Sequence, residues 1–532
     1  MLKRTAISFF GLMIVFGLLM VNLFLIEIDA GTAQSSKLSN TRSITLSSSR
    51  GMIYDCNMKK LVNSDSETVT VCLPSTTALN AISPYISESE KSEIYGNMTD
   101  GKVSIIKTTE QFSENDIKSV TVTNRYSKNQ PCVHLIGHLD DSGSGAMGLE
   151  KAYNSFLSSQ NGTLSAVWSA DAMGHVLYGD GIDFKSDGYL SPAGIQLTID
   201  LDIQRIAEEA LKNHGIDCGA AVVMDADTAE LLACVSAPAF DPLNLGASIN
   251  DESSPFLNRA SSSYSVGSVF KPFVAAAAIE SNIYIDHTCT GSIEIGSVTF
   301  GCNDNTAHGY VNLRTAMEKS CNTYFISLGQ KVGAEKIVSL CSAMGLGKET
   351  ELADNFYLKA GNLPSSDEIT SPPELANLSF GQGKLLASPI QMAAAYACFA
   401  NGGLYRSPTL MKAIIDENGD AVQKVRLPES RRVISRSTVS EVDSVLRSVV
   451  TDGNGNRAFS ELTDARGKTA TAQSGWYENG REISHTWFCG YFHLGDRTLV
   501  IVIFKEDGAS GAVDCAPVFK DISEKITEIP TY

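Results

Sequence analysis

The 532-residue chain is short of positive charge. It has 42 lysine and arginine residues against 60 aspartate and glutamate residues, which gives a formal net charge of −18. Proteins that bind nucleic acid present an excess of basic side chains to the phosphates, and a polybasic membrane patch needs the same excess. The composition therefore argues against nucleic acid as a partner and gives no support for a basic membrane-binding surface.

The sequence also lacks any Cys-x-x-Cys pair, although it contains 12 cysteines. That spacing is typical of zinc sites and of thioredoxin-like redox sites, so we predict neither, and no metal site. Cys289 and Cys302 flank a strand-rich segment and are the best candidates for a disulfide. Two buried free thiols are at least an equal alternative for this pair in a reducing habitat.

Only one long hydrophobic run is present, at residues 5–26. About 20 apolar residues suffice to cross a bilayer as a helix. Lys3 and Arg4 precede the run, which predicts that residues 1–4 stay in the cytoplasm and that the rest of the chain is exported. We predict an uncleaved single-pass transmembrane anchor. Small residues at positions 30–33 leave a cleaved signal peptide as the alternative.

In the C-terminal region, from residue 196, strand patterns come before and after a series of helical patterns. This order indicates an α+β fold, in which an antiparallel sheet carries helices on its faces and is closed by both ends of the segment. We predict a pedestal of mixed α/β structure at 27–195, without a catalytic constellation, and a catalytic domain at 196–532. The main elements expected are strands near 220–225, 230–235, 486–492 and 498–504, and helices near 202–211, 389–397 and 516–527.

One stretch places a serine and a lysine at helical spacing. Ser268 and Lys271 lie three residues apart before an alanine-rich run that favours a helix, and Pro272 fits only the first turn of that helix. An amine would then lie beside a hydroxyl. A lysine whose pKa is lowered by burial can take the serine proton and so activate a nucleophile. The alternative is an ordinary helix turn with a solvated lysine, because Ser-x-x-Lys is common by chance.

Two later stretches favour the catalytic interpretation. Ser320-Cys321-Asn322 lies between helical runs, and Lys468-Thr469-Ala470-Thr471 precedes strand-like sequence. Ser-x-x-Lys, Ser-x-Asn and Lys-Thr with a following small residue, in this order, are the signature of penicillin-recognising acyl-serine enzymes. The three motifs together therefore predict an acyl-enzyme chemistry at Ser268.

Further landmarks extend the similarity over nearly the whole chain. The chain resembles the class B penicillin-binding proteins, which are membrane-anchored, monofunctional peptidoglycan D,D-transpeptidases. The resemblance implies a transpeptidase fold preceded by a dimerisation-like pedestal. The landmark stretches are Arg50-Gly51-x-Ile53-x-Asp55, residues 145–153, Thr198-x-Asp200-x-x-x-Gln204, Asn258-Arg259 and residues 378–383.

The resemblance implies a catalytic role for four side chains. Ser268 would be the nucleophile and Lys271 the general base of acylation. Ser320 would bridge the two lysines and help to transfer the proton, and Lys468 would keep the site positive. The acyl donor would be a stem peptide that ends in D-Ala-D-Ala, and the acceptor an amine of a neighbouring strand.

The resemblance also implies how the substrate is bound. Asn322 would donate to the substrate peptide, and Thr469 would bind the terminal carboxylate together with Lys468. Thr471 belongs to the same substrate-binding strand. The backbone N–H groups of Ser268 and Thr471 would form the oxyanion hole. No metal or organic cofactor is implied.

Partners follow from the resemblance alone. The chain would be inhibited covalently by β-lactams and would pair, at the outer face of the cell membrane, with a polytopic glycosyltransferase of the shape, elongation, division and sporulation class. Cell shape and cell division are the processes that such enzymes serve.

Two alternatives stay open, and a departure from the family pattern motivates the first of them. Ala470 stands where the family usually has glycine, which predicts retained activity with altered β-lactam affinity. A catalytically impaired pseudo-transpeptidase that scaffolds a cell-wall complex is the first alternative. A β-lactamase is the second, although no Glu-x-x-Leu-Asn stretch supplies a deacylating base.

Overall fold

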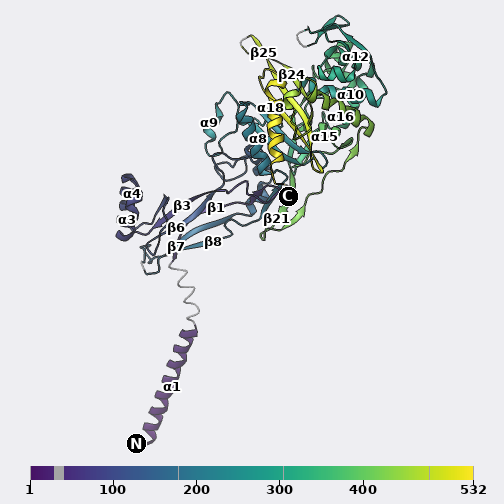
Figure 1. The fold of residues 1–532 in the computed structure, drawn as a ribbon. Coiled ribbons are helices and arrows are strands. Elements are labelled where there is room, and N and C mark those ends of the chain that lie inside the picture. The colour runs from purple at the N-terminus through teal and green to yellow at the C-terminus, as the bar shows by residue number, and fades with distance from the viewer. Residues whose placement is uncertain (1, 29–40, 178, 303–304, 479, 531–532) are drawn as a thin grey trace. The chain divides into compact units, whose positions relative to one another are not determined.

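The computed structural model describes residues 2–28, 41–177, 179–302, 305–478 and 480–530. The chain forms two compact units (Figure 1), and both are discontinuous in sequence. The division between pedestal and catalytic domain at residues 195 and 196 stays a prediction. The smaller unit consists of Met1–Arg50, Asn63–Arg125 and Asn161–Ser191, and the larger unit of Gly51–Val62, Tyr126–Gln160 and Pro192–Tyr532.

Helix α1 (Leu2–Ile28) is the first element of the chain. Residues 29–40, at the start of the predicted pedestal, lie outside the described residues. Within the ranges that the structure describes, no helix combines the length and the apolar character that crossing a membrane requires. The transmembrane anchor that we predicted for residues 5–26 is therefore not supported.

The smaller unit contains two antiparallel sheets, with strand orders β1-β7-β8 and β4-β3-β6-β5. Strand β3 is exposed at its start and buried over its last four residues, where it meets a small apolar cluster that includes residues of two helices. None of the predicted site residues lies in this unit. The elements are β1 (Thr41–Ser49), β3 (Asp65–Cys72), α3 (Thr76–Ile82), α4 (Glu88–Thr99), β4 (Ser104–Thr108), β5 (Ser113–Glu114), β6 (Ile117–Asn124), β7 (Gly162–Ser169) and β8 (Ile182–Asp187).

The larger unit is organised around a five-stranded antiparallel sheet with the order β11-β10-β26-β25-β24. Strand β26 comes from the end of the chain and pairs with β10 on one side and β25 on the other, so the prediction that both ends of the segment close one sheet is confirmed. The predicted hairpin between β10 and β11 is also confirmed. The strands are β10 (Gly219–Asp225), β11 (Leu231–Ala237), β24 (Arg466–Glu478), β25 (Arg481–Leu494) and β26 (Arg497–Lys505).

Helices cover both faces of this sheet, as predicted. In β10, Ala220, Val222 and Met224 belong to one apolar cluster, and Ala221 and Val223 to another. Every residue of β10 is buried, as expected for a strand with both faces covered. Helices α8 (Leu201–Asn213) and α18 (Ala516–Thr527) pack on one face. The other face carries α10 (Lys271–Glu280), α15 (Pro389–Ala400) and α16 (Arg436–Thr451).

Capping explains why α15 begins where it does. The hydroxyl of Ser388 accepts from the backbone N–H of Gln391, and the Gln391 side chain accepts from the N–H of Ser388. Pro389 fills the first helical position, where no N–H is needed. Further helices on this side of the sheet are α11 (Leu313–Glu318), α12 (Asn322–Val332), α13 (Ala334–Ala343) and α14 (Pro372–Ser379).

A second sheet of the larger unit contains an early piece of the chain. Strand β2 (Met52–Tyr54) runs parallel to β9 (Gly194–Leu197), and β9 also pairs with β21 (Met411–Ile415). This pairing explains why Gly51–Val62 belongs to the larger unit, although it precedes most of the smaller one.

Candidate active site

The proposed nucleophile lies on a short helical turn that leads into α10. A 3-10 helix, η3, spans Gly267–Phe270, and α10 begins at Lys271 with Pro272 in its first turn. Residues i and i+3 of such a turn lie on the same side, so Ser268 and Lys271 share a face. Ser268 is half-buried, and Lys271 is fully buried.

Three hydrogen bonds from distant elements hold this turn. The indole N–H of Trp487 donates to Ser265 O at 2.9 Å, and the hydroxyl of Tyr396 donates to Val269 O at 2.7 Å. The backbone N–H of Gly267 donates to Gly381 O at 2.8 Å. The backbone on both sides of Ser268 is therefore fixed before a substrate arrives, which is the preorganisation that a nucleophile needs.

Glycine at position 267 allows the turn to touch strand β24. Gly267 has a φ of +60°, and a Cβ on it would lie 2.9 Å from the Cβ of Ala472 and 3.5 Å from that of Ala470. The turn that carries Ser268 therefore lies directly against the part of β24 that contains the Lys-Thr motif.

Two lysines converge on one serine hydroxyl. The Nζ of Lys271 donates to Ser320 Oγ at 3.1 Å, and the Nζ of Lys468 donates to the same atom at 3.0 Å. Lys271 also donates to Ser320 O and to Asn322 Oδ1, both at 2.7 Å. The Nζ of Lys468 also donates to Thr469 O at 3.0 Å. The arrangement forms a continuous polar path from one lysine to the other.

Burial keeps both amines weakly basic. It lowers the pKa of Lys271 from 10.5 to about 7. It also lowers the pKa of Lys468 well below its usual value, and the neighbouring Lys271 lowers it further because two adjacent cations repel. The pair is therefore suited to exchanging a proton near neutral pH.

The Ser-Cys-Asn motif forms the bend between α11 and α12. Ser320 has a φ of +53°, a left-handed conformation that is uncommon for serine. Asn322 is the first residue of α12, and its side-chain N–H group donates to Gly301 O at 3.0 Å. The bend directs the oxygen atoms of Ser320 and Asn322 at the same lysine.

Strand β24 is an edge strand of the sheet. Lys468, Ala470 and Ala472 are buried on one side, and Thr469 and Thr471 alternate with them. Thr471 is exposed. The methyl group of Ala470 is 3% exposed and belongs to the apolar core, so it points away from the side of the strand that carries the two threonines.

The predicted site residues come together from three distant parts of the sequence. Lys271, Ser320, Asn322 and Lys468 share hydrogen bonds, and Ser268 lies against β24. The structure records no hydrogen bond between the Ser268 hydroxyl and Lys271 among the described residues. Such contacts are often long without substrate and tighten in the complex.

Three residues that support this site were not predicted from the sequence. Trp487 and Tyr396 were not singled out, and neither was Asn454, whose side-chain oxygen accepts from the Thr469 hydroxyl at 3.1 Å. Asn454 lies between Gly453 and Gly455, and a polar residue in such a tight loop was the available signal. Nothing in the local sequence around Trp487 or Tyr396 indicates their long-range bonds.

The disulfide candidate is wrong, and the alternative of buried free thiols is confirmed. Cys289 and Cys302 are both free, with their Sγ atoms 3.6 Å apart. A disulfide requires about 2.05 Å between the sulfur atoms.

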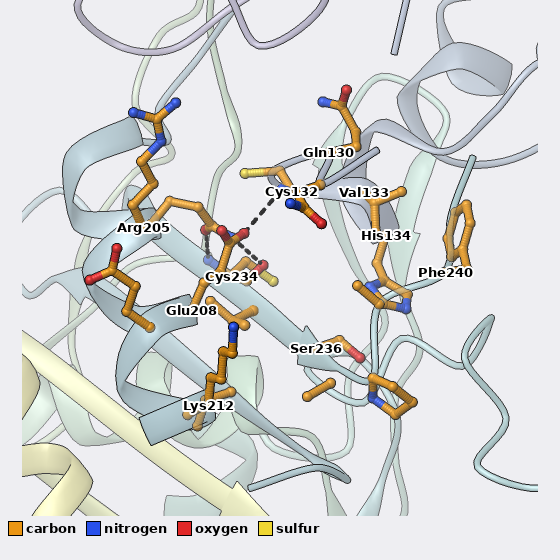
Figure 2. A pocket seen from close by; sticks show the side chains of 18 of the residues that line it. Gln130, Cys132, Val133, His134, Arg205, Glu208, Lys212, Cys234, Ser236 and Phe240 are labelled. Atoms are coloured by element: carbon orange, nitrogen blue, oxygen red, sulfur yellow. Dashed lines mark hydrogen bonds between the residues drawn. The ribbon is translucent and has the colours of Figure 1, made fainter. Parts of the chain in front are cut away.

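A large cavity elsewhere in the larger unit contains none of the predicted site residues. Figure 2 shows this cavity of about 870 Å³ beside α8. The carboxylate of Glu208 lines it and accepts from Gln204 Nε2 at 2.7 Å and from the N–H of Cys132 at 3.3 Å. None of the residues of the three motifs lines this cavity, so we do not place the reaction there.

Comparisons with known proteins show the family of the chain. The family described as "Penicillin binding protein transpeptidase domain" matches residues 219–524. The chain is 28% identical over 507 residues to stage V sporulation protein D of Bacillus subtilis, which covers 88% of this chain and 76% of that protein. It is 28% identical over 447 residues to the peptidoglycan D,D-transpeptidase FtsI homolog of Mesostigma viride, which covers 76% of this chain and 72% of that one.

A solved structure has the same fold. It is titled "Structural coordination of polymerization and crosslinking by a peptidoglycan synthase complex" and superposes with a TM-score of 0.70 at 22% identity. The superposition covers 98% of both chains. The agreement therefore extends over both units of the fold.

Proposed function

Because the chain belongs to the penicillin-binding protein transpeptidase family, we propose that it cross-links peptidoglycan as a serine D,D-transpeptidase. The observation that carries the proposal is the pair of buried lysines on Ser320 Oγ, next to a fixed serine turn. A solvated lysine is protonated at neutral pH and cannot act as a base, whereas these two are desolvated.

In the first half of the reaction, Ser268 Oγ attacks the carbonyl carbon between the two terminal D-alanines. The neutral amine of Lys271 takes the hydroxyl proton, and the backbone N–H groups of Ser268 and Thr471 bind the developing oxyanion. The C–N bond then breaks. The departing D-alanine takes a proton that passes through Ser320, and an ester remains on Ser268.

In the second half, an amine from a neighbouring strand attacks this ester. The same lysines accept the proton that the amine loses, and Ser268 regains its own proton as the new amide forms. The edge of β24 supports the alignment of the donor peptide, because an extended peptide can add to a free strand edge. In this proposal Thr469 binds the terminal carboxylate together with the positive charge of Lys468, Thr471 lies on the same substrate-binding strand, and Asn322 donates to the substrate peptide.

The test is intact-mass spectrometry after incubation with benzylpenicillin, on the full chain and on Ser268→Ala. We expect a stable adduct on the parent chain and none on the variant. An adduct that decays rapidly would favour a β-lactamase. No adduct on a parent chain shown to be folded would favour the scaffold, and an adduct on both proteins would contradict the role of Ser268.

The acylation rate is expected to rise with pH. Only neutral Lys271 can accept the serine proton, and its pKa is about 7, so the second-order rate constant should increase about tenfold from pH about 6 to well above 7 and then level off. Stopped-flow measurement with a chromogenic β-lactam gives the profile. Lys319→Met, which removes an exposed lysine next to the motif, should keep the same midpoint. A flat profile between these pH values would exclude Lys271 as the base.

We also propose that the protein acts at the outer face of the cell membrane, together with a glycosyltransferase. The substrate lies outside the cytoplasmic membrane, and the apolar side chains of α1 between Phe9 and Val21 are exposed, which favours association of this segment with the membrane. A glycosyltransferase that polymerises the strands is the proposed partner. The likeness to a protein whose structure title names a peptidoglycan synthase complex supports this choice.

A further inference from the structure

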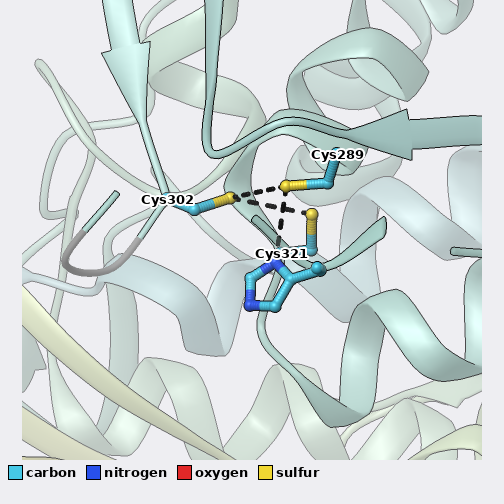
Figure 3. Close-up of side chains that lie close together, drawn as sticks. Cys289, Cys302 and Cys321 are labelled. Atoms are coloured by element: carbon cyan, nitrogen blue, oxygen red, sulfur yellow. Dashed lines mark hydrogen bonds between the residues drawn. The ribbon is translucent and has the colours of Figure 1, made fainter. Parts of the chain in front are cut away.

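Four potential metal ligands meet beside the Ser-Cys-Asn motif. They are Cys289, Cys302, Cys321 and His308, and their ligand atoms all lie within 4.8 Å of one another. Figure 3 shows the three sulfur atoms pointing toward a common centre. The three cysteines are at most 5% exposed. The proposed reaction uses none of these side chains.

Three of the six distances between the ligand atoms match a tetrahedral zinc centre, and all six lie within 4.8 Å. The sulfur atoms of Cys289 and Cys302 are 3.6 Å apart, those of Cys302 and Cys321 are 3.7 Å apart, and Cys289 Sγ is 3.5 Å from His308 Nδ1. With Zn–S bonds of about 2.3 Å and Zn–N bonds of about 2.0 Å, tetrahedral ligands are separated by roughly 3.5 to 3.8 Å. A Cys₃His set without an open position is typical of structural zinc.

Local elements hold the ligands in place. Cys289 ends β13 (His287–Cys289), which pairs with β16 (Gly309–Val311), so His308 lies next to Cys289 across the ladder. Cys302 directly follows β15 (Val298–Gly301). Cys321 directly precedes the first residue of α12.

A buried hydroxyl completes the surroundings of the sulfur atoms. Thr323 Oγ1 lies 3.3 Å from Cys321 Sγ and 3.8 Å from Cys302 Sγ, and His287 Nε2 lies 3.0 Å from the same oxygen. Hydrogen bonds of this kind orient metal ligands and are a regular part of metal sites. Four soft or borderline ligands, without a carboxylate, favour zinc over magnesium or calcium.

We propose that Cys289, Cys302, His308 and Cys321 bind one structural Zn²⁺ ion. Binding requires three thiolates and a neutral imidazole, so it releases three protons to solvent and leaves the oxidation states of zinc and sulfur unchanged. The ion joins the short strands around residues 287–311 to the start of α12. Strands this short contribute little apolar core, and a metal is a common substitute for it.

The proposed zinc site gives Cys321, the middle residue of the Ser-Cys-Asn motif, a role in positioning its two neighbours. Its neighbours Ser320 and Asn322 are the residues that accept hydrogen bonds from Lys271, so the ion fixes both acceptors through the bend. Cys321 is therefore a positioning residue. This second role rests on the proposed function, whereas the metal site itself does not.

Metal content tests the site without reference to activity. The full chain is purified without chelator, dialysed against Zn²⁺ and then against buffer, and analysed by inductively coupled plasma mass spectrometry. We expect about one zinc per chain in the parent, and loss of the metal in Cys302→Ser and in His308→Ala. Cys341→Ser is the matched control, because Cys341 is equally buried but lies outside the cluster, and it should keep the metal.

Cobalt provides a second measurement. Co²⁺ added to the metal-free chain should produce thiolate-to-cobalt charge-transfer absorption and the intense visible bands of tetrahedral cobalt, and zinc should abolish both. A folded parent chain that binds neither ion overturns the proposal. So does metal retained in both Cys302→Ser and His308→Ala, or a mass two hydrogens lower with these cysteines joined in a disulfide.

Chelation tests the positioning role. Removing zinc should slow acylation by benzylpenicillin about tenfold or more and leave the affinity of the initial complex within about twofold, and added zinc should restore the rate. Equal loss of affinity and rate would indicate general unfolding and contradict a positioning role. If zinc binds but no penicillin adduct forms, the proposed function fails and the metal site stands.

Discussion

Lys271→Met is expected to slow acylation by benzylpenicillin about a thousandfold, within the range that removal of a general base produces. Methionine keeps the length and apolar stem of the side chain but cannot accept a proton. Lys468 Nζ lies 3.0 Å from Ser320 Oγ and offers a longer path for the serine proton, so a small residual rate should remain. Stopped-flow kinetics with a chromogenic β-lactam measures the rate and the affinity of the initial complex separately.

The thermal stability of Lys271→Met separates loss of chemistry from loss of structure. Burial lowers the pKa of Lys271 to about 7, so the folded parent releases a proton at a lower pH than the unfolded chain does. The contribution of Lys271 to the free energy of unfolding therefore becomes more favourable as pH rises from about 7 toward 10.5. It is least favourable below pH 7, where the buried amine must carry a charge. The melting temperature of the variant minus that of the parent should therefore be larger at low pH than at high pH.

In the kinetic measurement, acylation of Lys271→Met within about tenfold of the parent rate would rule out Lys271 as the base.

Gly381→Ala is expected to destabilise the chain by about 3 kcal/mol or more and to abolish acylation. A Cβ at this position would lie 1.9 Å from Gly267 O, which no side-chain adjustment can relieve because the contact is with backbone. The clash would also disturb the hydrogen bond from Gly267 N to Gly381 O, one of the bonds that fix the turn of Ser268.

Gly383→Ala is the matched control for Gly381→Ala. The two glycines have nearly the same backbone angle, with φ of +82° and +81°, so the conformational cost of alanine is similar, about 1 to 2 kcal/mol. A Cβ on Gly383 meets no described atom closer than 3.3 Å. Gly381→Ala should therefore have a much lower melting temperature and a much lower acylation rate than Gly383→Ala. Equal effects would show that backbone strain alone, and not the contact with Gly267, explains the glycine at 381.

Local patterns in the sequence predicted the elements of the larger unit well. Hydrophobic periodicity, capping residues and turn residues were sufficient to predict three elements. These are the hairpin of β10 and β11, the helix after Ser388 and the final helix α18. The meeting of Lys271, Ser320 and Lys468 was predicted only through the resemblance, because no local pattern indicates which distant segments lie side by side.

The features that were missed depend on long-range pairing. The parallel contact of β2 with β9 brings an early segment into the larger unit, and a period of two cannot reveal the partner of a strand. The ligands of the proposed zinc site are spread over more than thirty residues, without the close pairs by which zinc sites are recognised. The left-handed bend at Ser320 was also missed, because serine rarely adopts it.

The strand order of the five-stranded sheet has a consequence for how the protein is made. Strand β26, among the last elements to be synthesised, fills the place between β10 and β25. Until it arrives, β10 lacks one neighbour, and β25, which carries the Trp487 that anchors the nucleophile turn, lacks one of its two neighbouring strands. In chains that stop before residue 497, Ser268 should not be acylated, even though the segment that contains it is complete. A covalent penicillin label would thus distinguish finished molecules from unfinished ones in a pulse-labelled population.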